Sequence, residues 1–172
     1  LKPYHIDYFM DFVAQMGAKA TFSARLREAT PEQAAELVRY VNIEKGYGVE
    51  YWSIGNEPTL FAAELQTFAK ADDYDTEQFN REWREFAAAM KAVDPTIKLV
   101  GPEVHQFTDN PNLNPKDSAG RDWMIEFLKA NGDLVDVVTF HRYPFPAGSD
   151  VGTVADLRAH TREWARTVPY LR

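Results

Sequence analysis

The stretch that decides the fold is residues 51–58, which read YWSIGNEP. It begins with the aromatic and β-branched side chains of a buried strand, and Pro58 ends it because proline cannot donate to a strand ladder. In parallel α/β proteins, the carboxyl ends of the strands face the ligand crevice. We therefore expect Asn56 and Glu57, at the end of this strand, to lie where a ligand binds.

The composition is that of one folded domain with a sizeable core, because the chain has 172 residues and 45% of them are hydrophobic. A formal charge of −7 and a pI near 5.1 argue against nucleic acid or an anionic membrane as a partner. No apolar run approaches the roughly 18–20 residues of a membrane span. The absence of cysteine excludes disulfides and thiolate chemistry but leaves the cellular compartment open.

Helical and strand patterns alternate along the whole chain. Apolar residues recur at spacings of three and four in the helical segments, whereas alternation or short apolar runs mark the strands. The predicted helices cover residues 5–16, 31–45, 76–93, 120–130 and 153–167, and the predicted strands cover residues 18–26, 49–57, 97–102 and 134–140. We expect the last strand to be covered on both faces, and Leu157 and Trp164 of the last helix to point inward.

The end of the strand at residues 49–57 resembles a known motif. Residues 55–58, Gly-Asn-Glu-Pro, are similar to the end of the fourth strand in the clan A retaining glycoside hydrolases, TIM-barrel enzymes that include families 5, 39 and 51. The resemblance implies that Glu57 is the general acid/base and that Asn56 hydrogen-bonds the sugar 2-hydroxyl. Alternatively, Glu57 only caps or salt-bridges a strand end, but the strand context favours the glycosidase interpretation.

The alternation predicts an α/β fold in which about four parallel strands alternate with helices, since right-handed crossovers bring successive strands into one sheet. No linker divides the chain, so we expect residues 1–172 to form a single domain. A complete (β/α)8 TIM barrel has about 250 residues, and four units therefore correspond to a partial barrel. If the Glu57 strand is the fourth, the chain is a half-barrel segment that runs from the second helix to the sixth.

Two residues after the strand at residues 134–140 extend the resemblance. His141 and Tyr143 are similar to the His-x-Tyr that clan A enzymes place beside the nucleophile, which implies that they orient a carboxylate and bind substrate. Alternatively, His141 is a structural histidine and Tyr143 packs beneath a proline loop. Their position after a buried strand favours the functional interpretation.

Further candidates follow the strand at residues 97–102. Glu103 should face the same rim and contact substrate, form a salt bridge, or serve as the general base of an inverting enzyme. His105 and Gln106 are candidate sugar contacts in the loop that follows. The four histidines, at positions 5, 105, 141 and 160, show no metal-binding spacing, and we expect neither a metal nor a cofactor.

The sequence supports two functions. The first is an O-glycoside hydrolase acting with retention on xylosides or arabinofuranosides, as the likeness to families 39 and 51 implies. The second is a non-catalytic carbohydrate-binding half-barrel or pseudo-enzyme. The resemblance implies a nucleophilic glutamate on the seventh strand, which we expect beyond Arg172, so that the isolated chain would be inactive. Unpaired sheet edges would then favour a homo-oligomer.

Overall fold

The computed structural model describes residues 2–62, 73–145 and 152–171, and its centre is a four-stranded parallel sheet. The strands are β1 (Thr21–Ala24), β2 (Tyr51–Ile54), β3 (Lys98–Val104) and β4 (Val137–Phe140), hydrogen-bonded in the order β1-β2-β3-β4. All neighbours pair in parallel. The prediction of parallel strands alternating with helices is therefore confirmed, and the sheet is open, as a partial barrel requires.

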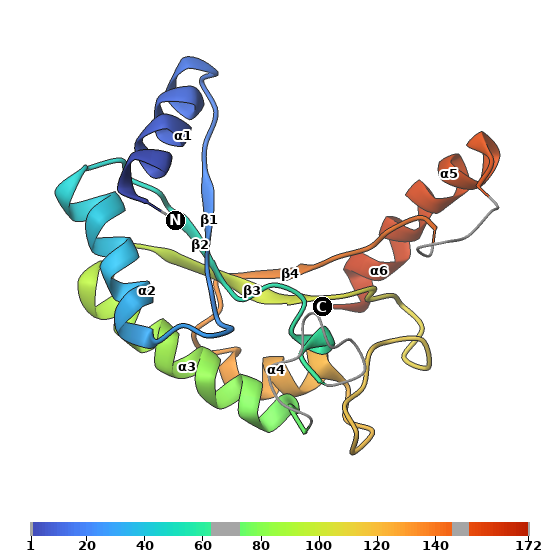
Figure 1. Cartoon of the computed structure of the whole chain (residues 1–172). Helices are drawn as coiled ribbons and strands as arrows, with labels where there is room; N and C mark the ends of the chain where they lie inside the picture. Colours follow the sequence, from blue (N-terminus) through green and yellow to red (C-terminus); the bar gives the residue numbers. More distant parts are fainter. Residues whose placement is uncertain (1, 63–72, 146–151, 172) are drawn as a thin grey trace.

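Helices separate the strands and cover one face of the sheet. Helix α1 (Pro3–Gln15) precedes β1, whereas α2 (Pro31–Val38), α3 (Thr76–Val93) and α4 (Trp123–Asn131) lie along the same face of the sheet (Figure 1). The π-helix η1 (Arg39–Glu44) continues α2, and the 3-10 helix η2 (Pro58–Leu60) follows β2. None of the helices in the described ranges has the length and apolar character needed to cross a membrane.

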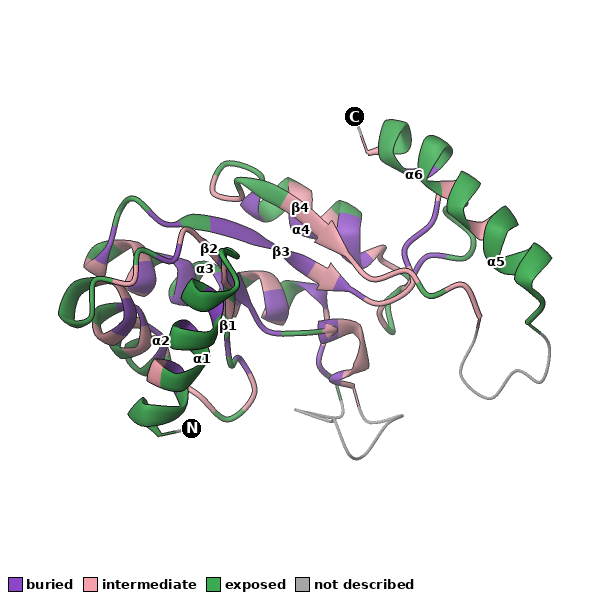
Figure 2. Cartoon of the chain, turned by 90° about the horizontal axis from the view of Figure 1, so that it is seen from above, coloured by how far each residue is buried: buried purple, intermediate pink, exposed green. Residues whose placement is uncertain are grey.

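The core lies between the sheet and these helices. Burial is concentrated in β2, β3 and the facing sides of α2 to α4, whereas β4 is of intermediate burial and α1, α5 and α6 are mainly exposed (Figure 2). Trp83 of α3 is fully buried and packs edge-to-face on Phe127 of α4, with 5.0 Å between ring centroids. A Cβ atom on Gly101 would lie 3.1 Å from the Phe127 ring, so the missing side chain lets both helices approach β3 closely.

Two predictions about burial near the end of the chain are wrong. The last predicted helix is present, as the contiguous helical segments α5 (Val154–His160), the 3-10 helix η4 (Thr161–Glu163) and α6 (Trp164–Tyr170). Leu157 and Trp164 are 47% and 41% exposed instead of pointing inward, and Val137 of β4 is 40% exposed instead of covered. The reason is that β4 is an edge strand of an open sheet, so the side chains of β4 and of the last helix are covered only in part. One such contact is the stacking of Trp164 on Phe140.

Candidate active site

Three strand ends meet at the carboxyl edge of the sheet. The backbone N–H of Glu57, just after β2, donates to the carbonyl oxygen of Glu103 on β3 at 3.0 Å. The N–H of His141, just after β4, donates to the carbonyl oxygen of Val104 at 2.8 Å. These bonds continue the strand pairing past the ends of β2 and β4. They hold Glu57, Glu103 and His141 next to one another, although the three residues are far apart in the sequence.

Strained backbone is concentrated at the same edge. Four non-glycine residues in the described ranges have positive φ: Glu57 (49°), Glu103 (58°), Gln106 (58°) and Glu28 (56°). All four follow, or lie at the end of, a strand of the sheet. Such conformations cost on the order of 1–3 kcal/mol each and are common at functional sites. The strained backbone therefore indicates a functional site at this edge, without reference to any sequence motif.

A β-bulge sets the position of Glu103. In the ladder between β3 and β4, Pro102 pairs with Thr139 and Val104 pairs with Phe140, which leaves Glu103 as the extra residue. A bulge bends the strand locally and re-aims the side chain at that point, and bulges are frequent beside active sites. The Glu103 side chain is 17% exposed and reaches the space above the strand ends.

The imidazole of His141 stands between two carboxyl groups. Its Nδ1 lies 2.7 Å from Oε1 of Glu57, and its Nε2 lies 3.2 Å from Oε2 of Glu103. The three side chains are between 17% and 24% exposed, so the cluster is largely shielded but keeps some contact with solvent. Because the ring fills the space between the carboxyl groups, they do not face each other across a gap for water, as the acid and base of an inverting enzyme do.

The other predicted site residues surround this cluster at different depths. Asn56 is exposed and lines a cavity of about 320 Å3 together with Arg25, Gly55 and Phe61. Tyr143 is 53% exposed and stands edge-on to His141, with 6.5 Å between ring centroids. His105 is partly buried in the turn that follows β3. The structure thus brings all six predicted residues to one edge of the sheet, with the closest contacts among Glu57, Glu103 and His141.

Arg142 is a supporting residue that the sequence did not indicate. Its guanidinium donates to Oε2 of Glu163 at 2.8 and 2.9 Å and to Oε1 of Gln106 at 2.9 Å. Gln106 was predicted to contact sugar, but its amide oxygen also accepts from the backbone N–H of Tyr143 at 3.4 Å. The hydrogen bonds of Gln106 therefore link the segment after β4 to the turn after β3. The one signal in the sequence for this role is that Arg142 is a charged residue between His141 and Tyr143.

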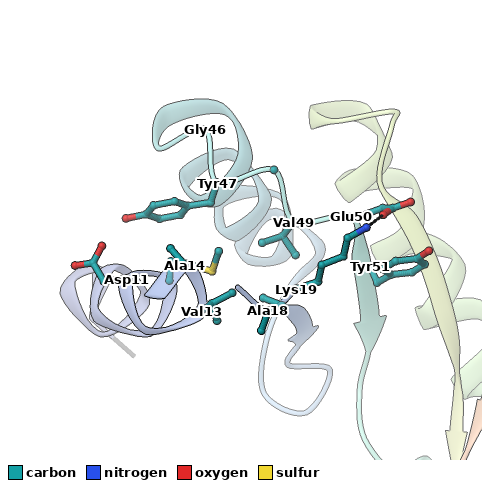
Figure 3. Close-up of a pocket in the computed structure, with 13 residues that line it drawn as sticks. Asp11, Val13, Ala14, Ala18, Lys19, Gly46, Tyr47, Val49, Glu50 and Tyr51 are labelled. Atoms are coloured by element: carbon teal, nitrogen blue, oxygen red, sulfur yellow. Dashed lines mark ion pairs between the residues drawn. The ribbon is translucent and has the colours of Figure 1, made fainter. Parts of the chain in front are cut away.

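A larger cavity lies at the opposite end of the strands. It has a volume of about 410 Å3 and is formed between α1 and the segment that leads into β2 (Figure 3). Lys19 and Glu50 form an ion pair at 3.6 Å on its wall, and Tyr47 and Val49 also line it. None of the predicted site residues is in this cavity. In parallel barrels, the amino-terminal end of the strands serves stability, and catalytic side chains come from the other end.

The cluster has the chemistry of proton transfer. A carboxyl group that contacts an imidazole can exchange a proton with it, and the partial exposure of Glu57 lets a bound ligand reach its carboxyl. Among the residues that the structure describes, no group of three or more His, Asp or Glu side chains is arranged to hold a metal ion. The contact between the Glu57 carboxyl and the His141 imidazole is what supports acid–base catalysis by side chains.

Comparisons with known proteins find relatives among the glycoside hydrolases. The family model for glycoside hydrolase family 44 matches residues 11–145. An intracellular exo-α-(1→5)-L-arabinofuranosidase from Halalkalibacterium halodurans is 27% identical over 150 residues, which are 78% of this chain and 27% of that protein. The chain thus spans about a quarter of the length of this curated relative.

Solved structures show the same fold. AbfB, a family 51 α-L-arabinofuranosidase from Bifidobacterium longum, has a TM-score of 0.68 at 17% identity, over 96% of this chain and 34% of that one. Cel44A, a family 44 endoglucanase from Clostridium thermocellum, has a TM-score of 0.66 at 18% identity, over 89% of this chain and 42% of that one. The resemblance to clan A TIM-barrel glycosidases is confirmed, and the motif alone did not single out the family that matches. The chain belongs to glycoside hydrolase family 44.

Proposed function

We propose that this chain is part of the catalytic domain of an O-glycoside hydrolase that acts with retention, and that Glu57 is its general acid/base. One observation carries the proposal: Glu57 follows a central strand, at the carboxyl edge where the strained backbone is concentrated, and its carboxyl contacts His141 at 2.7 Å. The match to a glycoside hydrolase family includes this residue. Residues 1–172 act in this proposal as a single half-barrel unit.

The remaining site residues have distinct roles in this proposal. Asn56 hydrogen-bonds the sugar 2-hydroxyl, and the exposed ring of Tyr143 offers a face for a sugar. His105 contacts substrate from the turn after β3. A retaining mechanism needs a second carboxylate about 5–5.5 Å from the first, and in this proposal a glutamate on the seventh strand of the complete barrel supplies it.

The substrate in this proposal is an O-linked sugar, with arabinofuranosides or xylosides as the first choice. The exo-arabinofuranosidase among the relatives supports the arabinofuranoside, whereas Cel44A is an endoglucanase, so a glucan is the main alternative. Nitrophenyl arabinofuranoside, nitrophenyl xyloside and a soluble glucan should therefore be compared in one assay with the full-length protein.

The decisive experiment is Glu57→Ala in the full-length protein. General acid catalysis contributes about 10²–10⁴-fold, so we expect a loss of this size on natural glycosides. Aryl glycosides with good leaving groups need less protonation and should lose less. Azide should restore part of the activity on such substrates, because it can attack the glycosyl-enzyme without a general base.

The matched control is Glu85→Ala, which removes an exposed carboxylate from α3. This variant should keep its activity. Unchanged hydrolysis of natural glycosides by Glu57→Ala would show that Glu57 is not the acid/base. Specific sugar binding without turnover by the unaltered full-length protein would instead favour the carbohydrate-binding alternative.

A further inference from the structure

We propose that Glu103 is a positioning residue that controls the proton of Glu57 through His141. This inference rests on the proposed function of Glu57, and it replaces the expectation that Glu103 mainly contacts substrate. The carboxylate of Glu103 would fix a proton on Nε2 of His141, which leaves Nδ1 to share a proton with Glu57. The three side chains then form one proton-sharing unit across the ends of β2, β3 and β4.

The two contacts of His141 with carboxyl groups can both be hydrogen bonds only if the three side chains share two protons. A carboxylate only accepts hydrogen bonds, and a neutral imidazole has one donor and one acceptor nitrogen. His141 has a carboxyl oxygen within hydrogen-bond distance of each nitrogen. One N–H is satisfied by Glu103, and the 2.7 Å contact with Glu57 then needs a second proton, bound either to Nδ1 or to the Glu57 carboxyl. The second proton is the one available for transfer to a leaving group.

The surroundings of His141 leave few other groups that could set its protonation. In the described ranges, the titratable side chains shown in contact with the ring are Glu57, Glu103 and Tyr143, and Arg142 follows His141 in the chain. The Arg142 guanidinium is bonded to Glu163 and Gln106. The Tyr143 ring meets the imidazole edge-on, without a hydrogen bond between them in the structure. The two carboxyl groups therefore dominate the electrostatics of His141.

The bulge explains why Glu103 can take this role. As the extra residue of the β3 ladder, Glu103 is freed from the regular alternation of the strand. Its backbone carbonyl accepts the N–H of Glu57 while its side chain contacts His141. Glu103 thus holds both partners of the proposed proton contact, one through its main chain and one through its carboxylate.

The proposed proton movement conserves charge and atoms. In the first half of the reaction, the second carboxylate of the retaining mechanism bonds to the anomeric carbon as the C–O bond to the leaving group breaks. The electron pair of that bond stays on the leaving-group oxygen, which takes the proton of the Glu57–His141 contact. In the second half, the water oxygen bonds to the anomeric carbon and loses a proton to the same contact, while the bond to the second carboxylate breaks and its electron pair returns to that carboxylate. Glu103 keeps its charge throughout and bonds to no substrate atom.

The test uses Glu103→Gln and Glu103→Ala in the full-length protein, with two readouts. The first is the pH profile of kcat/KM. A nearby negative charge strengthens the binding of a proton, so removing the Glu103 charge should weaken proton binding at the Glu57–His141 contact. Both variants should therefore move the alkaline limb of the kcat/KM profile to lower pH by about one unit. The Gln amide can still accept from Nε2, so Glu103→Gln should keep more of kcat at its optimum than Glu103→Ala.

The second readout is the 15N NMR shifts of the two His141 nitrogens, which report the tautomer without any substrate. Nε2 should stay protonated in the unaltered protein, whereas Glu103→Ala should populate both tautomers. The matched control is Asp109→Asn, a carboxylate in the same loop that pairs with Arg166. It should change neither readout.

The outcomes separate this inference from the proposed function. An unchanged tautomer and an unmoved alkaline limb in both Glu103 variants would overturn the positioning role, even if Glu57 is the acid/base. A changed tautomer in a protein that hydrolyses no glycoside would support the coupling of Glu103 to His141 and overturn the proposed function. Because Glu103→Gln preserves size and shape, it provides the pH-profile comparison if the Ala variant does not fold, and an unmoved alkaline limb in Glu103→Gln would then overturn the positioning role.

Discussion

Asn56 is the residue whose role can be tested most directly. It lies exposed beside Glu57, on the wall of the cavity at the ends of β1 and β2. A hydrogen bond to the sugar 2-hydroxyl strengthens as the ring flattens in the transition state. We expect Asn56→Ala to lower kcat on the order of 10- to 100-fold, with a smaller rise in KM.

A 2-deoxy substrate provides the control for Asn56. The unaltered protein should already be slow on this substrate, and Asn56→Ala should cause little additional loss. An equally large loss without the 2-hydroxyl would assign Asn56 a different role.

The sequence could predict the residues of the site but not their contacts. Asn56 and Glu57 belong to a local motif, and their strand follows from a local pattern. The contact between Glu57 and His141 joins residues 84 positions apart, and it depends on the register of three strands. The bulge at Glu103 depends on how many residues β4 provides opposite β3, which no local pattern reveals. The position of the His141 imidazole between the carboxyl groups of Glu57 and Glu103 therefore could not be predicted from the sequence and is known only from the structure.

At the scale of elements, the π-helix η1 connects α2 to the start of β2 and anchors it. Asn42, within η1, donates to the carbonyl oxygen of Val49 at 2.9 Å and accepts from the N–H of Val49 at 2.8 Å. Its amide also donates to Oδ2 of Asp94 at 2.8 Å. The sequence predicts one helix here and misses the wider turn, since the periodicity of apolar residues does not distinguish an α-helix from a π-helix over six residues.

We expect Asn42→Ala to lower the free energy of unfolding by about 2 kcal/mol, because partly buried polar groups of Val49 and Asp94 lose their partner. Chemical denaturation of the protein would measure the loss. The matched control is Asn112→Ala in an exposed loop, which should leave the denaturation midpoint unchanged. A neutral effect of Asn42→Ala would show that water replaces the amide at no cost.

The same contact predicts a pH dependence. Burial would raise the pKa of the Asp94 carboxyl, but hydrogen bonds from Thr96 and Asn42 outweigh it and hold the pKa below its ordinary value. The unfolded chain then binds this proton more readily, so the stabilisation is complete above the unfolded pKa and is lost as the pH falls through the folded one. Stability should decline in this acidic range, and less steeply in Asn42→Ala. Equal slopes in the two proteins would contradict the coupling.

At the scale of the whole molecule, the open sheet has two unpaired edges. In the described part of the chain, β1 pairs only with β2, and β4 pairs only with β3. Large apolar side chains on α1 and at its C-terminal end are also exposed, including Tyr8 (70%), Phe12 (58%) and Met16 (64%). Open edges and apolar faces of this kind invite association with another chain.

We therefore expect residues 1–172, produced alone, to self-associate at micromolar concentration, and light scattering would measure the mass. Replacing Phe12 and Met16 with Lys should weaken the association through charge repulsion and loss of apolar contact. A strictly monomeric chain would refute the edge argument. In the same preparation, a 2-fluoroglycoside should leave no covalent adduct, and an adduct on any carboxylate would locate the nucleophile within these residues.

The bulge at Glu103 also affects how the protein can evolve. Pro102 and Val104 already pair with the consecutive residues Thr139 and Phe140, so deletion of the residue between them would leave the ladder in register. The main structural loss would be the hydrogen bond from the Glu57 N–H to the Glu103 carbonyl. A single-codon deletion could thus remove one carboxylate of the site while the sheet persists. Related lineages could therefore gain or lose this carboxylate by insertion or deletion, without redesigning the barrel around it.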